Sequence, residues 1–239
     1  MLPESLEDVV TNIKDPRRWA DFESLVAVMT EVPSVRGMVY GNVAEVEFAK
    51  WLVKQGVPME DQTRDDDHAR TKSDRTILFE GRRYTIQLKS LQTNSVKEQS
   101  PGHFAAHLQC DASDRRTVTL STGSEVQTTC YVAGEFDVLC VALHPFLREW
   151  EFAFQLNSSL PRSSRRTKLT KHLTDEELGE LLKTLVPFEW PMPANGGWTR
   201  DLFSLLRAAP DLGEAVEVSD HETVVRLPGS DREATIEDE

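Results

Sequence analysis

The feature that most constrains the fold is an almost uninterrupted apolar run from Phe136 to Leu143, which contains a single charged residue, Asp137. A strand that carries apolar side chains on both sides has to be covered on both faces. The run therefore predicts a strand inside a sheet, with a layer of the protein on each face. The chain has 239 residues, 39% of them hydrophobic, and a chain of that length can bury roughly 70% of its unfolded surface.

The segments before this run change their period from helix to strand. Apolar residues recur at helical spacing over Leu6–Ile13, Trp19–Met29 and Val43–Val53, with Pro16 after the first segment, Pro33 closing the second and Gly56 after the third. Two β-rich runs follow, Thr76–Phe79 and Tyr84–Leu88, joined by the turn residues Glu80–Arg83. This pattern predicts a β-hairpin directly after a helical region.

The remaining segments complete an α/β pattern. Residues 92–116 are polar and are expected to be irregular, strands are expected at 118–120, 128–132 and 151–155, and helices at 174–185 and 199–208. We expect an α/β fold with a mixed central β-sheet of roughly four to six strands flanked by helices. Residues 1–213 are expected to form one domain with an N-terminal helical part, and residues 214–239 an acidic C-terminal tail that need not be ordered.

Charge, cysteines and hydropathy limit the class of protein. The net charge is −13, of which nine acidic residues and two arginines in 214–239 contribute −7, so that −6 remains for the rest of the chain. This balance argues against a polycation that coats nucleic acid, although it allows a local basic groove. No apolar run approaches the ~18 residues of a membrane helix. The acidic N-terminus is unlike a signal peptide, and three cysteines without CxxC spacing suggest reduced thiols, so a cytoplasmic protein without a membrane partner is expected.

The residues that point to chemistry lie on the expected hairpin. Gln87 and Lys89 are two apart on the second strand, so their side chains project from the same face. Asp74 precedes the first strand, and a tight hairpin can bring it beside the end of the second. An aspartate oxygen, an amide oxygen and an ammonium would then converge. Hard oxygen ligands suit Mg²⁺, and a neighbouring lysine can stabilise phosphate charge or help to deprotonate a water.

This arrangement resembles the PD-(D/E)XK nuclease superfamily, which includes type II restriction endonucleases. Residue by residue, Asp74 matches the metal-binding aspartate, Gln87 the acidic-or-glutamine position and Lys89 the motif lysine, while Glu45 matches the glutamate on the preceding helix. The sequence departs from the pattern at Ser73, where the motif has proline, and at Gln87, which carries no charge. The segment Tyr131–Leu139 resembles a later core strand of restriction-type members. The resemblance covers about residues 45–145.

The resemblance implies a restriction-endonuclease-like core and an endodeoxyribonuclease that depends on Mg²⁺, for which Mn²⁺ would substitute. Asp74, Glu45, Gln87 and the Leu88 carbonyl would hold the metal, and Lys89 would act on the attacking water. The implied function is a restriction-type or phage-defence nuclease that acts as a homodimer on double-stranded DNA. Two alternatives stay open. They are a cleavage-deficient nuclease scaffold that binds DNA or serves in assembly, and an effector-gated nuclease acting on RNA or single-stranded DNA.

Other candidate residues are weighed beside these. Glu47 is the rival of Glu45 as the helix carboxylate, and Asp67, in the acidic run Asp65–His68, is the fallback for Asp74. His103, His107 and Cys110 suggest zinc only weakly, because no fourth ligand has suitable spacing. Six basic residues are the candidate contacts to the phosphate backbone: Arg82 and Arg83 in the hairpin turn, and Arg162, Arg165, Arg166 and Lys168 in the one strongly basic run.

Overall fold

The structure is a computed structural model of the chain and describes residues 21–59, 73–91, 93–209 and 211–215. Contacts divide the chain into two units, Met1–Val43 and Ala44–Glu239. In the first unit, helix α2 (Phe22–Glu31) begins after Asp21, whose carboxylate accepts a hydrogen bond of 2.7 Å from the Ser24 N–H. The expected helix over residues 6–13 lies outside the described residues.

Helix α3 (Pro33–Lys54) continues from the first unit into the second. Pro33 was expected only to close the previous helix, yet it also begins α3, since proline is well suited to the first helical turn. The predicted end of this helix is confirmed. Gly56 adopts a positive φ of 68° just beyond Lys54, a conformation that costs glycine little.

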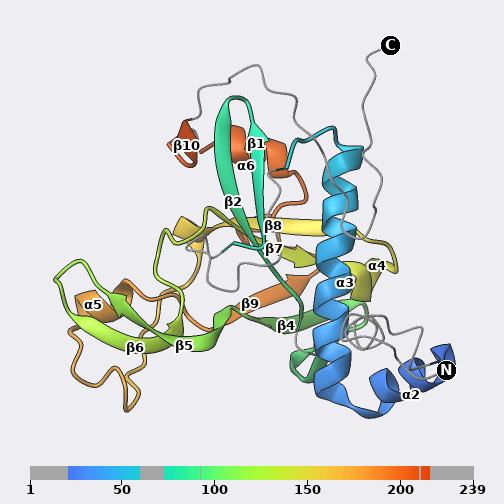
Figure 1. Ribbon diagram of the computed structural model, residues 1–239, viewed down its shortest axis with the longest axis horizontal. Coiled ribbons are helices and arrows are strands. Elements are labelled where there is room, and N and C mark those ends of the chain that lie inside the picture. Colours follow the sequence, from blue (N-terminus) through green and yellow to red (C-terminus); the bar gives the residue numbers. More distant parts are fainter. Residues whose placement is uncertain (1–20, 60–72, 92, 210, 216–239) are drawn as a thin grey trace, which may run out of the picture. The chain divides into compact units, whose positions relative to one another are not determined.

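The second unit is built on a mixed five-stranded sheet, as predicted (Figure 1). It contains β1 (Arg75–Phe79), β2 (Arg82–Lys89), β7 (Val138–Ala142) and β8 (Phe152–Leu156) in that order, and β10 (Glu214–Ala215) pairs with β2. Strands β2 and β7 are parallel and the other pairs are antiparallel. The hairpin turn is tight, because Glu80 and Gly81 both adopt positive φ.

Each face of this sheet is covered, and β7 is buried along its whole length, as its apolar run predicted. Helices α3, from Ala44 on, and α6 (Leu202–Arg207) pack on one face through Phe48, Leu52 and Leu202. The other face packs against a three-stranded sheet of β3 (Lys97–Ser100), β4 (His103–Gln109) and β9 (Leu185–Trp190). Short segments η2 (Thr93–Ser95), α4 (His144–Leu147) and η3 (Asn157–Ser159) connect these elements.

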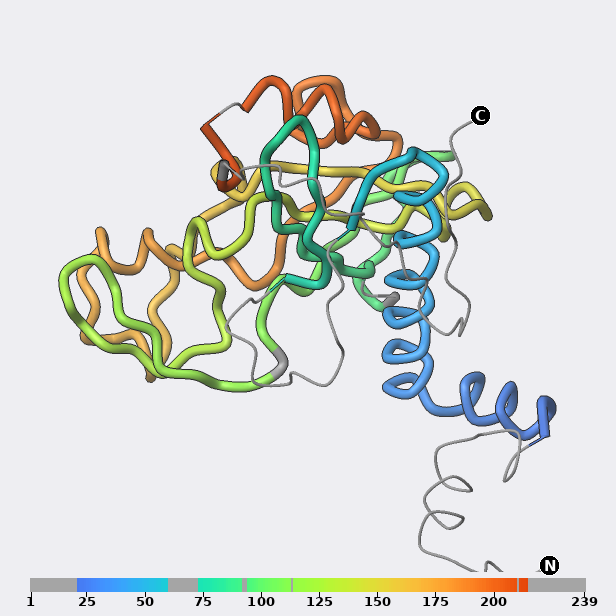
Figure 2. The backbone as a smooth tube through the Cα atoms, turned by 45° about the horizontal axis from the view of Figure 1, so that its top comes forward, coloured from blue at the N-terminus to red at the C-terminus, as the bar shows by residue number. Residues whose placement is uncertain are grey.

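Strands β5 (Asp111–Thr119) and β6 (Glu125–Cys130) form a separate antiparallel hairpin. Figures 1 and 2 show it beside the short helix α5 (Asp175–Gly179), against which Val118, Val126 and Leu178 form a small core. We call β5, β6 and α5 the hairpin arm.

Three element predictions need correction. Residues 92–116 are not irregular, because they hold β3, β4 and the start of β5. The helix expected over 174–185 ends at Gly179, since Leu181 and Leu182 are drawn into buried β-bridges. The later core strand begins only at Val138, and residues 131–137 form a loop. Of the expected tail, only Glu214 and Ala215 lie within the described residues, so the boundary at 213 stays a prediction.

Among the described residues, every helix is too short or too polar to span a lipid bilayer.

Candidate active site

The hairpin brings Asp74 against Gln87, as predicted from their spacing. The Asp74 N–H donates to the Ile86 carbonyl at 3.0 Å, which extends the β1–β2 pairing by one residue. The Asp74 Oδ2 then accepts hydrogen bonds from the Gln87 side-chain amide and, at 2.7 Å, from the Leu88 N–H. Gln87 is only 3% exposed, so this contact is enclosed by the protein.

Asp74 lies in an environment that disfavours the charged form of its carboxyl group. Burial raises the pKa of this carboxyl above its ordinary value, while the charge of Lys89 and the hydrogen bonds from Leu88 and Gln87 lower it in part. A carboxylate withdrawn from water gains from any cation placed beside it. The pKa of Asp74 is therefore perturbed by burial and by a charged partner, as is typical of carboxylates at functional sites.

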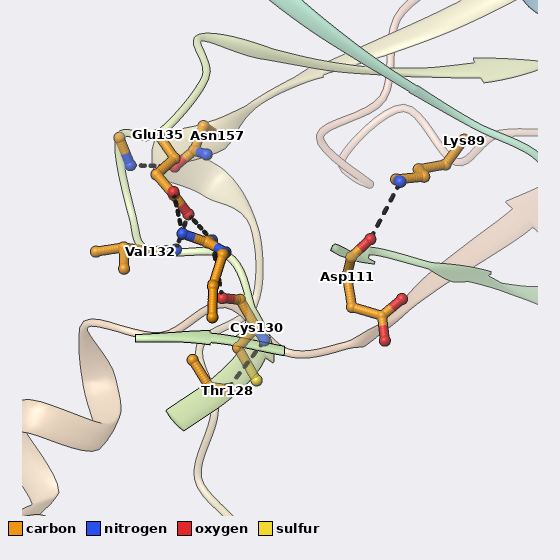
Figure 3. Close-up of polar contacts among 9 residues, drawn as sticks. Lys89, Asp111, Thr128, Cys130, Val132, Glu135 and Asn157 are labelled. Carbon is orange, nitrogen blue, oxygen red and sulfur yellow. Dashed lines mark hydrogen bonds and ion pairs between the residues drawn. The ribbon is translucent and has the colours of Figure 1, made fainter. Parts of the chain in front are cut away.

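Lys89 lies on the same face of β2 as Gln87 and is held by two groups from other parts of the chain. Its ammonium donates to the Asp111 carbonyl at 3.2 Å, as Figure 3 shows, and lies 5.5 Å from the centre of the Tyr131 ring. Burial and, after it, the charge of Asp74 raise the pKa of the Tyr131 hydroxyl.

Glu45 reaches this region through the backbone of α3. The guanidinium of Arg75 donates to the Asp74 carbonyl at 2.7 Å and, more weakly, to the Glu45 carbonyl at 3.4 Å. Glu47 instead forms a surface ion pair of 2.7 Å with Lys50. Because the Arg75 contact is made by the backbone carbonyl of Glu45, the choice of Glu45 over Glu47 as the helix carboxylate stays a prediction.

Leu88 contributes to the site through its backbone. Its side chain is 5% exposed and belongs to the core between the sheet and α3, while its N–H donates to Asp74. That its carbonyl binds a metal stays a prediction.

Sequence reasoning missed a second cluster beside Lys89. Arg116, on β5, forms a two-point ion pair with Glu135 at 2.5 and 2.7 Å, and its guanidinium carbon lies 5.6 Å from the centre of the same Tyr131 ring. The Val132 N–H also donates to Glu135 at 2.6 Å (Figure 3). Hydrophobic periodicity does not predict these contacts, because they join the loop 131–137 to a strand 15 to 19 positions earlier in the sequence.

The basic candidates divide into several environments. Arg83 and Arg162 line one cavity although they are 79 positions apart, whereas Arg82 projects from the opposite face of β2. Arg166 forms an ion pair of 2.5 Å with Asp175 in α5, and Arg165 and Lys168 are exposed.

The two weaker metal suggestions fare differently. His103 is exposed while Cys110 is buried in the core, where burial raises the pKa of the thiol to about 12, so the three proposed zinc ligands do not converge. The acidic run Asp65–His68, with Asp67, lies outside the described residues.

Comparison with known proteins adds little. No protein-family model and no curated protein matches this chain. Among solved structures, a bacterial homing endonuclease, I-Ssp6803I, is similar with a TM-score of 0.33 and 17% sequence identity, over 56% of this chain and 84% of that one. The similarity is weak, and we base no conclusion on it.

Proposed function

We propose that the protein is a metal-dependent DNA endonuclease of restriction or phage-defence type that acts as a homodimer on double-stranded DNA. The observation that supports this most directly is the contact of Asp74 with Gln87, with Lys89 held on the same face of β2. A buried carboxylate, an amide and an ammonium gathered at one strand end suit the hydrolysis of a phosphodiester. Glu45 is the candidate second carboxylate, since its backbone carbonyl is linked to that of Asp74 through Arg75.

The residues present fit a hard divalent cation such as Mg²⁺ or Mn²⁺. Asp74 is a carboxylate whose burial disfavours its charged form, which a cation would restore, and the other candidate ligands, Glu45, the Gln87 amide and the Leu88 carbonyl, also offer oxygen. When bound, the ion would polarise the phosphate and lower the pKa of a coordinated water.

The chain's own groups then do the positioning. Lys89 is fixed by the Asp111 carbonyl and the Tyr131 ring, so its ammonium can orient the attacking water and stabilise the charge that develops on the phosphate. Arg75 ties the backbone of Asp74 to that of Glu45 and so keeps the two candidate ligands together.

Plasmid cleavage tests the proposal. Incubation of the wild-type protein with Mg²⁺ or Mn²⁺ is expected to cut duplex DNA, with RNA and single-stranded DNA run in parallel. Asp74→Asn and Lys89→Ala are expected to abolish cutting while DNA binding survives, and the exposed control variants Asp114→Asn and Lys54→Ala should cut normally. Full activity of Asp74→Asn would refute the site and direct attention to Asp67.

A second candidate, a DNA-binding scaffold without cleavage, is favoured by Gln87 itself, which meets Asp74 with an amide donor and brings no charge to a cation. Gln87→Glu discriminates between the two. In an active enzyme it adds Coulomb attraction, so half-maximal cutting should move to a lower Mg²⁺ concentration. In a scaffold, the wild type does not cut, and two adjacent carboxylates should lower the melting temperature in chelator. Gln127→Glu, at an exposed position of β6, is the control.

A further inference from the structure

The β5–β6 ribbon of the hairpin arm has one buried face and one exposed face. On the buried face, Arg116 contacts Glu135 and Val118 packs in the small core beside α5. Successive residues of a strand project from opposite faces, and the residues that flank these two on β5 are exposed. We call them the outer face of β5: Arg115, Thr117 and Thr119.

The outer face of β5 carries side chains that can read base edges. In the major groove of DNA a guanidinium donates two hydrogen bonds to guanine, and the methyl group of a threonine contacts that of thymine. Glu125, opposite Thr119 on β6, is also exposed, and a carboxylate accepts from the amino group of cytosine. Every exposed large apolar residue of the described chain lies outside β5 and β6, so this face lacks the apolar anchors of a protein–protein interface. Its chemistry favours nucleic acid over a protein partner.

The dimensions of the ribbon suit the same partner. Two paired strands lie about 4.8 Å apart, and the major groove, which is about 12 Å wide, admits a two-stranded ribbon. Figures 1 and 2 show that the hairpin arm extends away from the five-stranded sheet. The ribbon therefore has the width and the position of an element that can enter this groove.

The far end of the ribbon is held in place before any partner binds. Ser121, in the turn between β5 and β6, donates to Glu180 at the end of α5 through its N–H at 2.9 Å and its hydroxyl at 2.7 Å. The Thr122 hydroxyl donates to Glu177 at 2.6 Å. A ribbon that is ordered in advance loses little conformational freedom on binding, which favours affinity and a defined register on DNA.

The near end of the ribbon is joined to the candidate active site. The Asp111 carbonyl, at the start of β5, accepts from the Lys89 ammonium, and Arg116 contacts the same Tyr131 ring as Lys89. Arg115 is four residues from Asp111, which is at most about 13 Å along a strand that rises about 3.3 Å per residue. That distance corresponds to about four base pairs of DNA.

We propose that the outer face of β5 lies in the major groove of duplex DNA and that Arg115 donates to a guanine there, so that it determines the sequence which the protein binds. The proposal rests on the proposed function for its choice of DNA as the partner. It adds a specificity-determining residue to that function, and it predicts cleavage within about four base pairs of the guanine.

Selection of bound duplexes from a randomised pool, carried out in chelator with the full chain, tests the proposal without cleavage. The wild type is expected to enrich a motif with guanine at one fixed position. Arg115→Ala should lose the preference for guanine there, and its affinity for the wild-type motif should fall about tenfold. Arg115→Gln should replace guanine by adenine at that position, because a glutamine amide pairs with adenine. Arg148→Ala, exposed after α4, is the matched control and should select the wild-type motif.

The selected motifs separate this inference from the nuclease. The same motif in the wild type and in both Arg115 variants would overturn the inference, even if the protein cuts DNA. Binding of the wild type without sequence preference, or binding confined to RNA or single strands, would overturn it as well. A loss of affinity in Arg115→Ala with the guanine retained would assign Arg115 to a phosphate and overturn its role in reading bases. Conversely, a wild type that never cuts but selects guanine through Arg115 refutes the nuclease and keeps the outer face as a DNA-reading surface.

Discussion

Tyr131 is placed between two cations, and its ring is the most direct link between the candidate site and the rest of the fold. Lys89 Nζ and the guanidinium carbon of Arg116 lie 5.5 and 5.6 Å from its centre. Each contact of this kind contributes about 0.5–2 kcal/mol, with the upper values where water is excluded. The ring is 5% exposed and packs edge-on against Phe136 at 5.3 Å. The position of the ring is therefore fixed by packing in the core, and the contact with this fixed ring helps to hold the Lys89 ammonium in place.

Replacing this ring should reduce turnover more than binding. Tyr131→Leu removes the cation–π contact, so Lys89 loses one of its two described supports, and we expect kcat for DNA cleavage to fall about tenfold with KM nearly unchanged. Tyr131→Phe keeps the ring and should keep the activity. Steady-state cleavage kinetics measure both. Tyr84→Leu, a buried tyrosine of the other core, controls for general loss of packing, and an equal effect there would contradict a positioning role.

At the level of single residues, the sequence predicts what the hairpin alone determines. Asp74 and Gln87 are 13 positions apart and meet because a two-residue turn fixes the register of β1 and β2. Arg116 and Tyr131 were not predicted, because their contacts with the site join segments whose spacing in the sequence carries no period. Arg83 and Arg162 were predicted as separate phosphate contacts, and only the fold shows that they share a cavity.

A carboxylate of α5 joins the elements of the hairpin arm in addition to their small apolar core. Glu177, in the first turn of α5, accepts from the Thr174 N–H at 2.8 Å and so completes the capping box of this helix. It also accepts from the hydroxyls of Ser124 and Thr122 at 2.5 and 2.6 Å, which fastens the β5–β6 turn to α5. The hydrogen bond from Ser124 is the largest of the causes that lower its pKa to about 2.

This shift predicts that the protein loses stability in acid. In the unfolded chain Glu177 should titrate near its ordinary value of 4.5, so its contribution is present above that pH and is lost as the pH falls towards about 2. Glu177→Gln should flatten the pH dependence of the unfolding free energy over that window, measured by urea titration at several pH values. Glu176→Gln, exposed on the same helix, is the control. Identical curves for the wild type and Glu177→Gln would contradict the prediction.

At the level of elements, the local sequence pattern predicts a helix or strand only where the buried residues are the contiguous or periodic apolar residues of that segment. The buried run of β7 and the hairpin of β1 and β2 were predicted because their apolar and turn residues are contiguous. Strand β4 was missed, since only Ala106 and Leu108 of its seven residues are buried and its stability comes from pairing with β9, about 80 positions later. The second layer under the sheet was therefore not predicted.

For the whole molecule, the distribution of charge determines where a polyanion such as DNA can bind. The net charge is −13, yet Arg165 and Lys168 are exposed near the hairpin arm, and Arg166 is engaged by Asp175. Arg166 would have to leave that ion pair to contact a phosphate. Within the basic run of residues 162–168, Arg165 and Lys168 therefore carry the positive charges most available for contact with a phosphate.

Neutralising these two residues should weaken binding to every DNA sequence alike. Removing one cation from a phosphate flattens the slope of log affinity against log salt by about one, so Arg165→Ala/Lys168→Ala should reduce it by about two. Adding Arg166→Ala should change it less than one further unit, because that guanidinium is already paired with Asp175. Binding of two unrelated duplexes, followed in chelator over a range of salt, measures these slopes. Lys97→Ala/Arg148→Ala removes two exposed charges elsewhere, and the same flattening in that variant would show that net charge alone, and not this segment, governs the interaction with DNA.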